Sequence, residues 1–167
     1  PIDKKSVKFF INKYRDSIEK TEASFFEVMT AMAFWYFQKN KVDYAIMETG
    51  LGGKYDSVTA CSADIFGITS ISKDHQNILG NKLEDIANEK VAAISDHSHV
   101  YYINQKNKVE KIISDYCDQK KCKYKKIKTN FNLQISIPGD HQKENASLAL
   151  SIANHINPNI KNLKESL

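Results

Sequence analysis

Short apolar runs alternate with amphipathic stretches along this chain of 167 residues, and the alternation limits the fold more than any other feature. Short apolar runs are typical of buried strands, and apolar residues recurring every three or four positions are typical of helices. Strands separated by helices pair in parallel, and both faces of a parallel sheet are covered by helices. We therefore predict an α/β fold, a mainly parallel sheet with helices on both faces. The expected strands are 44–48, 65–71, 100–103, 123–127 and 131–137, and the expected helices are 7–14, 24–39, 82–94, 109–118 and 142–155.

The predicted helix at 24–39 carries a start signal. Ser24 is followed three residues later by Glu27, a spacing at which each side chain can bond the backbone amide of the other in a capping box. An aromatic stripe runs along one face of this helix, and core packing explains the stripe better than a cofactor pocket does.

Composition indicates one globular domain of ordinary size, with 41% apolar and 26% charged residues. Cys61, Cys117 and Cys122 lack paired spacing, so we expect neither a disulfide framework nor a structural zinc site. A reducing compartment, the cytoplasm, fits this cysteine usage. No apolar stretch reaches the roughly 18–20 residues needed to cross a bilayer, so no membrane partner is expected.

The net charge of +4 is modest, and much of it comes from six lysines between positions 120 and 128. Tyr124 is the single aromatic residue among them. A solvated surface run is therefore favoured over a nucleic-acid site, and no nucleic-acid partner is expected.

The segment 44–57 joins an apolar run to a carboxylate and a glycine turn. The run ends at Glu48, and Gly50, Gly52 and Gly53 follow. Glycines allow a tight turn in which the backbone approaches a ligand closely. Ligands of open α/β sheets bind at the carboxyl ends of strands. We therefore expect Glu48 and this glycine loop to belong to a functional site.

Further polar residues are expected at the same sheet edge. Asp74 and His75 follow the next predicted strand, and Lys90 lies on the helix after that loop. A carboxylate and an imidazole near strand ends suit a divalent cation that binds phosphates, because magnesium takes only one or two protein ligands. Taken singly, His75 is typical of an exposed loop, and Lys90 is typical of a helix surface where it pairs with Glu89 or Asp85.

The last predicted helix begins with side-chain amides. Gln142 and Asn145 lie three residues apart and so share a face. An amide offers a donor and an acceptor together and can read the edge of a purine. The alternative is polar helix capping, with Asp140 as the candidate N-cap. No Walker A sequence, GxxxxGK[ST], occurs, which excludes a complete P-loop enzyme within these residues.

Taken in order, these pieces resemble the central ATPase domain of the folylpolyglutamate synthase/dihydrofolate synthase family, part of the Mur ligase superfamily. The resemblance covers about residues 20–155. Five motifs carry it: Ser24-Phe-Phe-Glu27 with Thr30, Glu48-Thr-Gly-Leu-Gly-Gly-Lys-Tyr-Asp56, Thr69-Ser-Ile-Ser-Lys-Asp-His75, Asn88-Glu-Lys90 and Gly139-Asp-His-Gln-Lys-Glu-Asn145.

The resemblance implies an ATP-dependent amide ligase that adds L-glutamate to dihydropteroate or folate through an acyl phosphate. It implies that Glu48 binds the magnesium that bridges the ATP phosphates and that His75 binds a second magnesium. Lys90 matches a lysine that carbon dioxide converts into an anionic carbamate. The implied catalytic and metal residues are therefore Glu48, His75 and Lys90.

The resemblance also implies how the organic substrates are held. Asn145 matches the adenine contact, with His141 and Gln142 beside it. The residues that match positions near the pterin and its reacting carboxylate are Ser24, Phe26, Glu27, Gly52, Gly53 and Asp56. The loop departs from the usual Arg-Leu-Asp-Ala-Thr-Asn of the family, because this chain has Lys54-Tyr55-Asp56-Ser57-Val58-Thr59, which keeps the aspartate and loses the threonine and the asparagine of the pattern.

Family members place a phosphate-binding loop upstream of the Ser24 helix and a glutamate-binding domain downstream. The chain starts at Pro1 without a methionine, so the resemblance implies an excerpt, inactive alone, of an enzyme expected to be a monomer. We expect residues 1–156 to be a partial central domain and 157–167 a linker or frayed end. The alternatives are another Mur-type ligase, or a non-catalytic nucleotide- or nucleic-acid-binding module that uses the lysines at 120–128.

Overall fold

The computed structural model describes residues 1–73 and 80–159, and the chain forms two compact units. Unit 1 consists of Pro1–Leu51 and Tyr55–Ala60, and unit 2 consists of Gly52–Lys54 and Cys61–Leu167. The glycine loop therefore contributes residues to both units. The predicted domain boundary at residue 156 stays a prediction.

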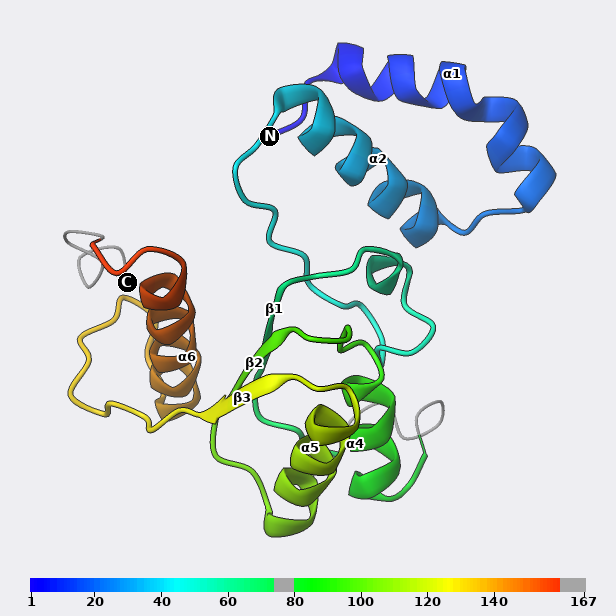
Figure 1. Cartoon of the computed structure of the whole chain (residues 1–167). Helices are drawn as coiled ribbons and strands as arrows, with labels where there is room; N and C mark the ends of the chain where they lie inside the picture. Colours follow the sequence, from blue (N-terminus) through cyan, green and yellow to red (C-terminus); the bar gives the residue numbers. More distant parts are fainter. Residues whose placement is uncertain (74–79, 160–167) are drawn as a thin grey trace. The chain divides into compact units, whose positions relative to one another are not determined.

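Two helices, α1 (Lys4–Thr21) and α2 (Phe25–Asn40), form most of unit 1 (Figure 1). They pack through aromatic rings, with the Trp35 centroid 5.5 Å from that of Phe10 and 5.6 Å from that of Phe9. The Lys39 ammonium adds a hydrogen bond of 3.2 Å to the Ser6 hydroxyl. Both predicted helices are confirmed.

Helix α1 begins earlier than its apolar pattern indicates because a polar cap starts it. The Asp3 carboxylate accepts a hydrogen bond of 2.9 Å from the Ser6 amide, which is a standard N-cap interaction. In α2 the capping box of Ser24 and Glu27 is present as predicted.

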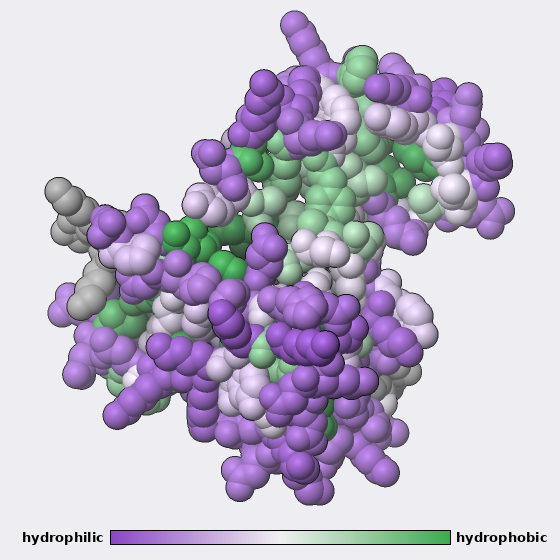
Figure 2. All heavy atoms as spheres, viewed as in Figure 1, coloured by the Kyte–Doolittle hydropathy of each residue, from purple (hydrophilic) through white to green (hydrophobic). Residues whose placement is uncertain are grey.

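Apolar side chains occur all round α2 and gather on its visible surface (Figure 2), and Phe25 is 81% exposed.

The predicted strand at 44–48 is wrong. These residues are irregular, and Ile46 is 94% exposed. An apolar run becomes a strand only where a neighbour completes its hydrogen-bond ladder. Among the described residues no strand pairs with this segment, so its composition alone does not give a strand. The short 3-10 helix η1 (Ser57–Ala60) follows it.

Unit 2 contains a parallel sheet of β1 (Ile65–Ile68), β2 (His99–Tyr102) and β3 (Lys123–Lys126), in that order. Val100 is in register with Phe66 on one side and Tyr124 on the other. The helices are α4 (Leu83–Val91), α5 (Asn107–Gln119) and α6 (Asp140–Ile156).

The central strand β2 buries both of its faces. Val100 and Tyr102 belong to one core cluster with residues of α4 and α5, including Ile86 and Ile113. Tyr101 and the residue after the strand, Ile103, belong to a second cluster with Leu148 and Ile152 of α6. Figure 1 shows α4 and α5 on one side of the sheet and α6 on the other. The predicted α/β class, with helices on both faces of a parallel sheet, is confirmed.

Strand β1 is shorter than predicted because, after Ile68, its backbone bonds to a side chain and not to the neighbouring strand. The buried Gln105 accepts a hydrogen bond of 3.0 Å from the Ile71 amide and donates one of 2.8 Å to the Thr69 carbonyl. This clamp joins the segment that follows β1 to the segment that follows β2. Residues 74–79, and with them the predicted polar loop around His75, lie outside the described residues.

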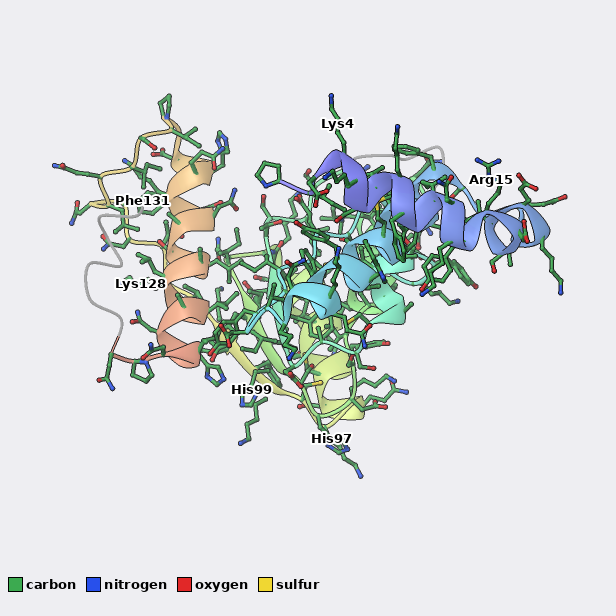
Figure 3. All side chains as sticks on the ribbon, turned by 90° about the horizontal axis from the view of Figure 1, so that it is seen from above. Lys4, Arg15, His97, His99, Lys128 and Phe131 are labelled. Atoms are coloured by element: carbon green, nitrogen blue, oxygen red, sulfur yellow. The ribbon has the colours of Figure 1, made fainter. Side chains whose placement is uncertain are left out.

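The predicted strand at 131–137 is also wrong. The segment is irregular, and only Leu133 in it is buried, while Ile137 is 59% exposed. It runs beside α6, where Figure 3 labels Lys128 and Phe131, and the Asn130 amide donates to the Ser147 hydroxyl at 2.9 Å. The alternation of polar and apolar residues in this segment therefore does not correspond to a strand of the described sheet.

Helix α6 also starts differently from the prediction. Its N-cap is Gly139, with φ at 122°, and Asp140 is the first helical residue. The positive φ is costly for any residue with a side chain. A β-carbon at this position would also lie 2.7 Å from a ring carbon of His141, so the sequence must place glycine here.

Residues 52–54 dock on the C-terminal end of α4. A β-carbon at Gly53 would lie 2.7 Å from the Glu89 carbonyl oxygen and 2.9 Å from that of Lys90. The next residue, Lys54, donates its amide to the Glu89 carbonyl at 3.1 Å. Gly53 thus permits a close contact between two backbones.

We predict that Gly53→Ala destabilises unit 2 by about 1–3 kcal/mol, because the added methyl group must push fixed carbonyls apart. Urea denaturation followed by circular dichroism measures the loss, and hydrogen exchange reports whether the Lys54 amide loses protection. Gly50→Ala is the matched control, since its closest neighbour is the movable tip of the Phe26 ring. Equal protection of the Lys54 amide in wild type and Gly53→Ala would contradict the docking described above.

A second prediction concerns the core beneath α5. Ile113 is 0% exposed, so Ile113→Ala should lower the free energy of unfolding by about 2–5 kcal/mol. The neighbouring Ile112 is only partly buried, and Ile112→Ala should cost clearly less in the same urea titration. Similar losses for the two variants would show that the core is arranged differently.

Candidate functional site

The glycine loop of unit 1 is folded around the carboxylate of Asp56. One carboxylate oxygen, Oδ2, accepts hydrogen bonds from the amides of Gly50 at 2.7 Å and Leu51 at 2.9 Å. The other oxygen accepts one from the Val58 amide at 2.9 Å. Three backbone donors therefore converge on one side chain, and Asp56 fixes the turn. Its predicted contact with substrate stays a prediction.

Helix α2 holds the same loop from the side. The Ser57 hydroxyl donates to the hydroxyl of the buried Thr30 at 2.8 Å. One turn earlier on the helix, the tip of the Phe26 ring lies 2.9 Å from the position of a β-carbon on Gly50. Phe26 remains 44% exposed, so its ring is available to a flat aromatic ligand.

Ser24 and Glu27, also predicted to lie near substrate, bond each other. The Glu27 carboxylate accepts from the Ser24 amide at 2.7 Å and from the Ser24 hydroxyl at 2.6 Å. The hydrogen bond from the Ser24 hydroxyl is the main cause that lowers the pKa of Glu27, followed by the bond from the Ser24 amide. Both side chains therefore act by starting the helix that carries Phe26.

Glu48 is exposed and precedes the hydrogen-bonded residues Gly50, Leu51 and Asp56 of the loop by two, three and eight residues. Among residues 1–73 and 80–159 its carboxylate forms no hydrogen bond or ion pair. A free carboxylate is the type of oxygen ligand that magnesium prefers. The chemistry of Glu48 therefore fits a magnesium site, although the strand expected to carry it does not form.

Lys90 lies in the last turn of α4 and is partly buried. Its carbonyl faces Gly53, so the structure brings these two predicted site residues together within unit 2. The surface ion pair expected with Glu89 or Asp85 is absent from the described part of the chain. The lysine side chain is thus free of an acidic partner there.

The predicted histidine ligand, His75, lies outside the described residues. Within the described ranges, no group of three or more His, Cys, Asp or Glu side chains is placed to hold a metal ion. The predicted metal set of Glu48, His75 and carbamylated Lys90 therefore stays a prediction.

The start of α6 presents the predicted adenine contacts. Gln142 and Asn145 share a face, as predicted, and the Asn145 amide group donates to the Gln142 carbonyl oxygen at 3.5 Å. Both side chains are partly buried, whereas His141 is exposed and its ring lies over Gly139. Two adjacent amides leave free donors and acceptors, which is the property a purine edge requires.

The lysines between 120 and 128 are partly neutralised. Lys126 pairs with Glu110, and Lys120 pairs with Asp96 at 3.0 Å. All four residues of β3 are exposed, and β3 forms one edge of the described sheet. Lysines on an edge strand hinder pairing with another chain, so the solvated-surface interpretation accounts for them.

Sequence reasoning missed two positioning interactions, the clamp made by Gln105 and the hydrogen bond between Ser57 and Thr30. Each joins segments about 30 residues apart, which no local pattern reveals. The only signals in the sequence were a glutamine shortly after a predicted strand and a serine next to Asp56, and neither signal is specific. In the described part of the chain, no helix is long and apolar enough to cross a membrane.

Comparison with known proteins agrees with the predicted resemblance. Residues 4–130 match the Mur ligase middle domain family. A dihydrofolate synthase/folylpolyglutamate synthase of Bacillus subtilis is 30% identical and aligns over 85% of this chain. A folylpolyglutamate synthase of Arabidopsis thaliana is 31% identical over 77% of this chain.

Solved structures show the same fold. The folylpolyglutamate synthase of Thermotoga maritima superposes with a TM-score of 0.84 at 23% identity, covering 99% of this chain and 45% of that one. The Mycobacterium tuberculosis enzyme, complexed with ADP and AMPPCP, gives a TM-score of 0.80 at 23% identity, covering 98% and 46%.

The chain spans 39% of the Bacillus subtilis relative and 21% of the Arabidopsis relative. The family match nevertheless extends over most of the chain and includes α1, α2, the glycine loop, the sheet and the helices α4 and α5. The chain therefore belongs to the Mur ligase middle domain family.

Proposed function

We propose that this chain supplies magnesium- and nucleotide-binding residues to an ATP-dependent ligase that joins L-glutamate to dihydropteroate or folate. The observation that carries the proposal is the glycine loop of unit 1. Its amides are ordered by Asp56, it follows the carboxylate of Glu48, which has no partner among the described residues, and the exposed ring of Phe26 lies against it. The names of the relatives support the substrate class.

In the proposed reaction, the carboxylate of the folate or dihydropteroate attacks the γ-phosphorus of ATP and ADP leaves. The amine of glutamate then attacks the acyl phosphate, loses a proton and expels inorganic phosphate, and an amide bond remains. Several anionic oxygens must be held together in both steps, so the protein needs fixed charges and donors.

Glu48 would hold magnesium, with His75 at a second position and Lys90, as its carbamate, beside them. When bound, magnesium neutralises the phosphate oxygens and orients them for in-line transfer. The absence of an acidic partner for Lys90 in the described residues is consistent with this use, since an ion pair would compete with reaction of the amine.

The organic parts of the substrates would be held by uncharged groups. The face of Phe26 would stack on the pterin ring, while Asp56 would keep the loop in the shape that accepts it. Gln142 and Asn145, with His141 beside them, would contact adenine through their amides. Gly52 and Gly53 would let the loop pass close to both α4 and the substrate.

The whole enzyme would act as a cytoplasmic monomer. Because the relatives are more than twice as long as the matched region, we propose that this chain alone does not catalyse ligation. ATP- and glutamate-dependent ligation by the isolated chain would contradict that part of the proposal.

We predict that Glu48→Gln in the full-length protein lowers kcat for ligation by at least about tenfold, because the amide cannot replace an anionic magnesium ligand. Release of phosphate and formation of the glutamyl conjugate measure the effect, and the magnesium concentration for half-maximal rate should rise. Glu19→Gln, an exposed carboxylate on α1, is the control and should leave the rate unchanged. A Glu48→Gln enzyme with wild-type rate and magnesium dependence would exclude the proposed role.

A further inference from the structure

Unit 2 contains a hollow of about 650 Å³ whose described lining includes none of the residues assigned above to a substrate. It is lined by Lys73, residues 81–84 and residues 106–108, and we call it the basic hollow. Lys73 follows β1 and Lys106 follows β2 along the chain. The hollow therefore lies beyond the carboxyl ends of two adjacent parallel strands, where open α/β sheets bind ligands.

The side chains around the basic hollow are strongly unbalanced in charge. Four lysines and one glutamate line it, which gives a net charge of +3. Lys108 forms an ion pair of 3.0 Å with Glu84. Lys73, Lys82 and Lys106 are exposed. They form no ion pair with any residue of the described ranges. Within the described residues, three positive charges around one concave surface are thus left without an ion-pair partner.

The backbone adds to this positive potential. The helices α4 and α5 both begin at the hollow, and their N-cap residues are Lys82 and Lys106. Neither cap side chain accepts a hydrogen bond from the first turn, since lysine carries no acceptor. The first amides of a helix lack partners within the helix and carry a partial positive charge. Lysine at both caps is opposite to the usual preference for an oxygen acceptor.

A carboxylate of the chain already responds to this field. The pKa of Glu84 lies below its usual range, first because its carboxylate accepts a hydrogen bond from its own backbone amide, and then because Lys108 donates to it. The charge of Lys82 acts in the same direction. A helix-start amide and a lysine therefore both favour the anionic form of this carboxylate.

The walls are held in place by buried contacts. Gln105, next to Lys106, clamps the segment that leads to Lys73 through its bonds to Thr69 and Ile71. Helices α4 and α5 share the core cluster that contains Ile86 and Val109. Lys82 and Lys106 therefore stand at the starts of two helices that pack on one core.

We propose that the basic hollow is a binding site for a small polyanion that carries two or more phosphate or carboxylate groups. Three unpaired lysines require more than one negative group for neutralisation, and the two helix starts offer amides to the same oxygens. The volume admits a compact ligand. None of the residues that line the hollow is among those that the proposed function assigns to ATP, folate and magnesium, so the proposal is tested independently of that function.

The test is a titration of the ¹⁵N-labelled chain with pyrophosphate and, separately, with citrate, at low and constant ionic strength, where surface charges are least screened. We expect saturable shifts of the amides of Leu83, Asn107 and Lys108. Lys82→Gln combined with Lys106→Gln should weaken binding by at least about tenfold, as two charge-assisted contacts are lost. Glu84→Gln should tighten binding, because the resident carboxylate no longer competes.

The matched control is Lys121→Gln combined with Lys125→Gln, which removes the same charge from exposed positions outside the hollow. This variant should bind as the wild type does. Binding of pyrophosphate alone would identify a phosphate site, binding of citrate alone a carboxylate site, and both results would support the proposal. Absence of saturable shifts with either probe, or equal weakening in the control variant, would overturn it. Circular dichroism of each variant verifies that the fold is retained.

Discussion

Burial of both faces of strand β2 is the constraint on which unit 2 depends. Val100 and Ile103 are each 0% exposed and face opposite sides, so two separate layers of helices must cover one strand. Full burial of an aliphatic side chain contributes about 1.5–3 kcal/mol, which makes this strand and its covering residues the main source of stability. Its continuation, Gln105, then fixes the segment after β1, and the next residue, Lys106, is the N-cap of α5.

Unit 1 depends on a different kind of interaction. Helix α2 begins at a capping box and carries Phe26 and Thr30 on one side, one turn apart. The loop that packs there is shaped by Asp56, whose two oxygens accept three backbone hydrogen bonds. A charged residue is thus used to build a surface, and the residues that it orders are the ones proposed to meet the substrate.

The parts of the fold that could be predicted from the sequence are those governed by local rules. The capping box of Ser24 and Glu27 and the helices around Ile113 and Leu148 follow from spacing, because their energetics involve neighbours three or four residues apart. The strands at 44–48 and 131–137 failed because a strand needs a partner that its own residues do not specify. Ile46 shows this most clearly, since an apolar residue predicted to be buried is 94% exposed.

The candidate site likewise has features that local motifs predict and features that depend on contacts between distant segments. The motifs around Glu48, Lys90 and Asn145 identified the family, but neither the hydrogen bond between Ser57 and Thr30 nor the arrangement of lysines at two helix starts could be read from them. These features join segments that are distant in the chain, and only the folded structure brings them together. Asp56 illustrates the consequence, because its position in the motif indicates a substrate contact while its hydrogen bonds show that it orders the backbone.

The most direct test of the proposed ligase site is a crystal structure of the full-length protein with magnesium and a non-hydrolysable ATP analogue. The proposal predicts a carboxylate oxygen of Glu48 at about 2.0–2.1 Å from a magnesium ion that also binds phosphate oxygens. A structure in which the nucleotide and its magnesium are bound while Glu48 coordinates neither the ion nor one of its water ligands would contradict it.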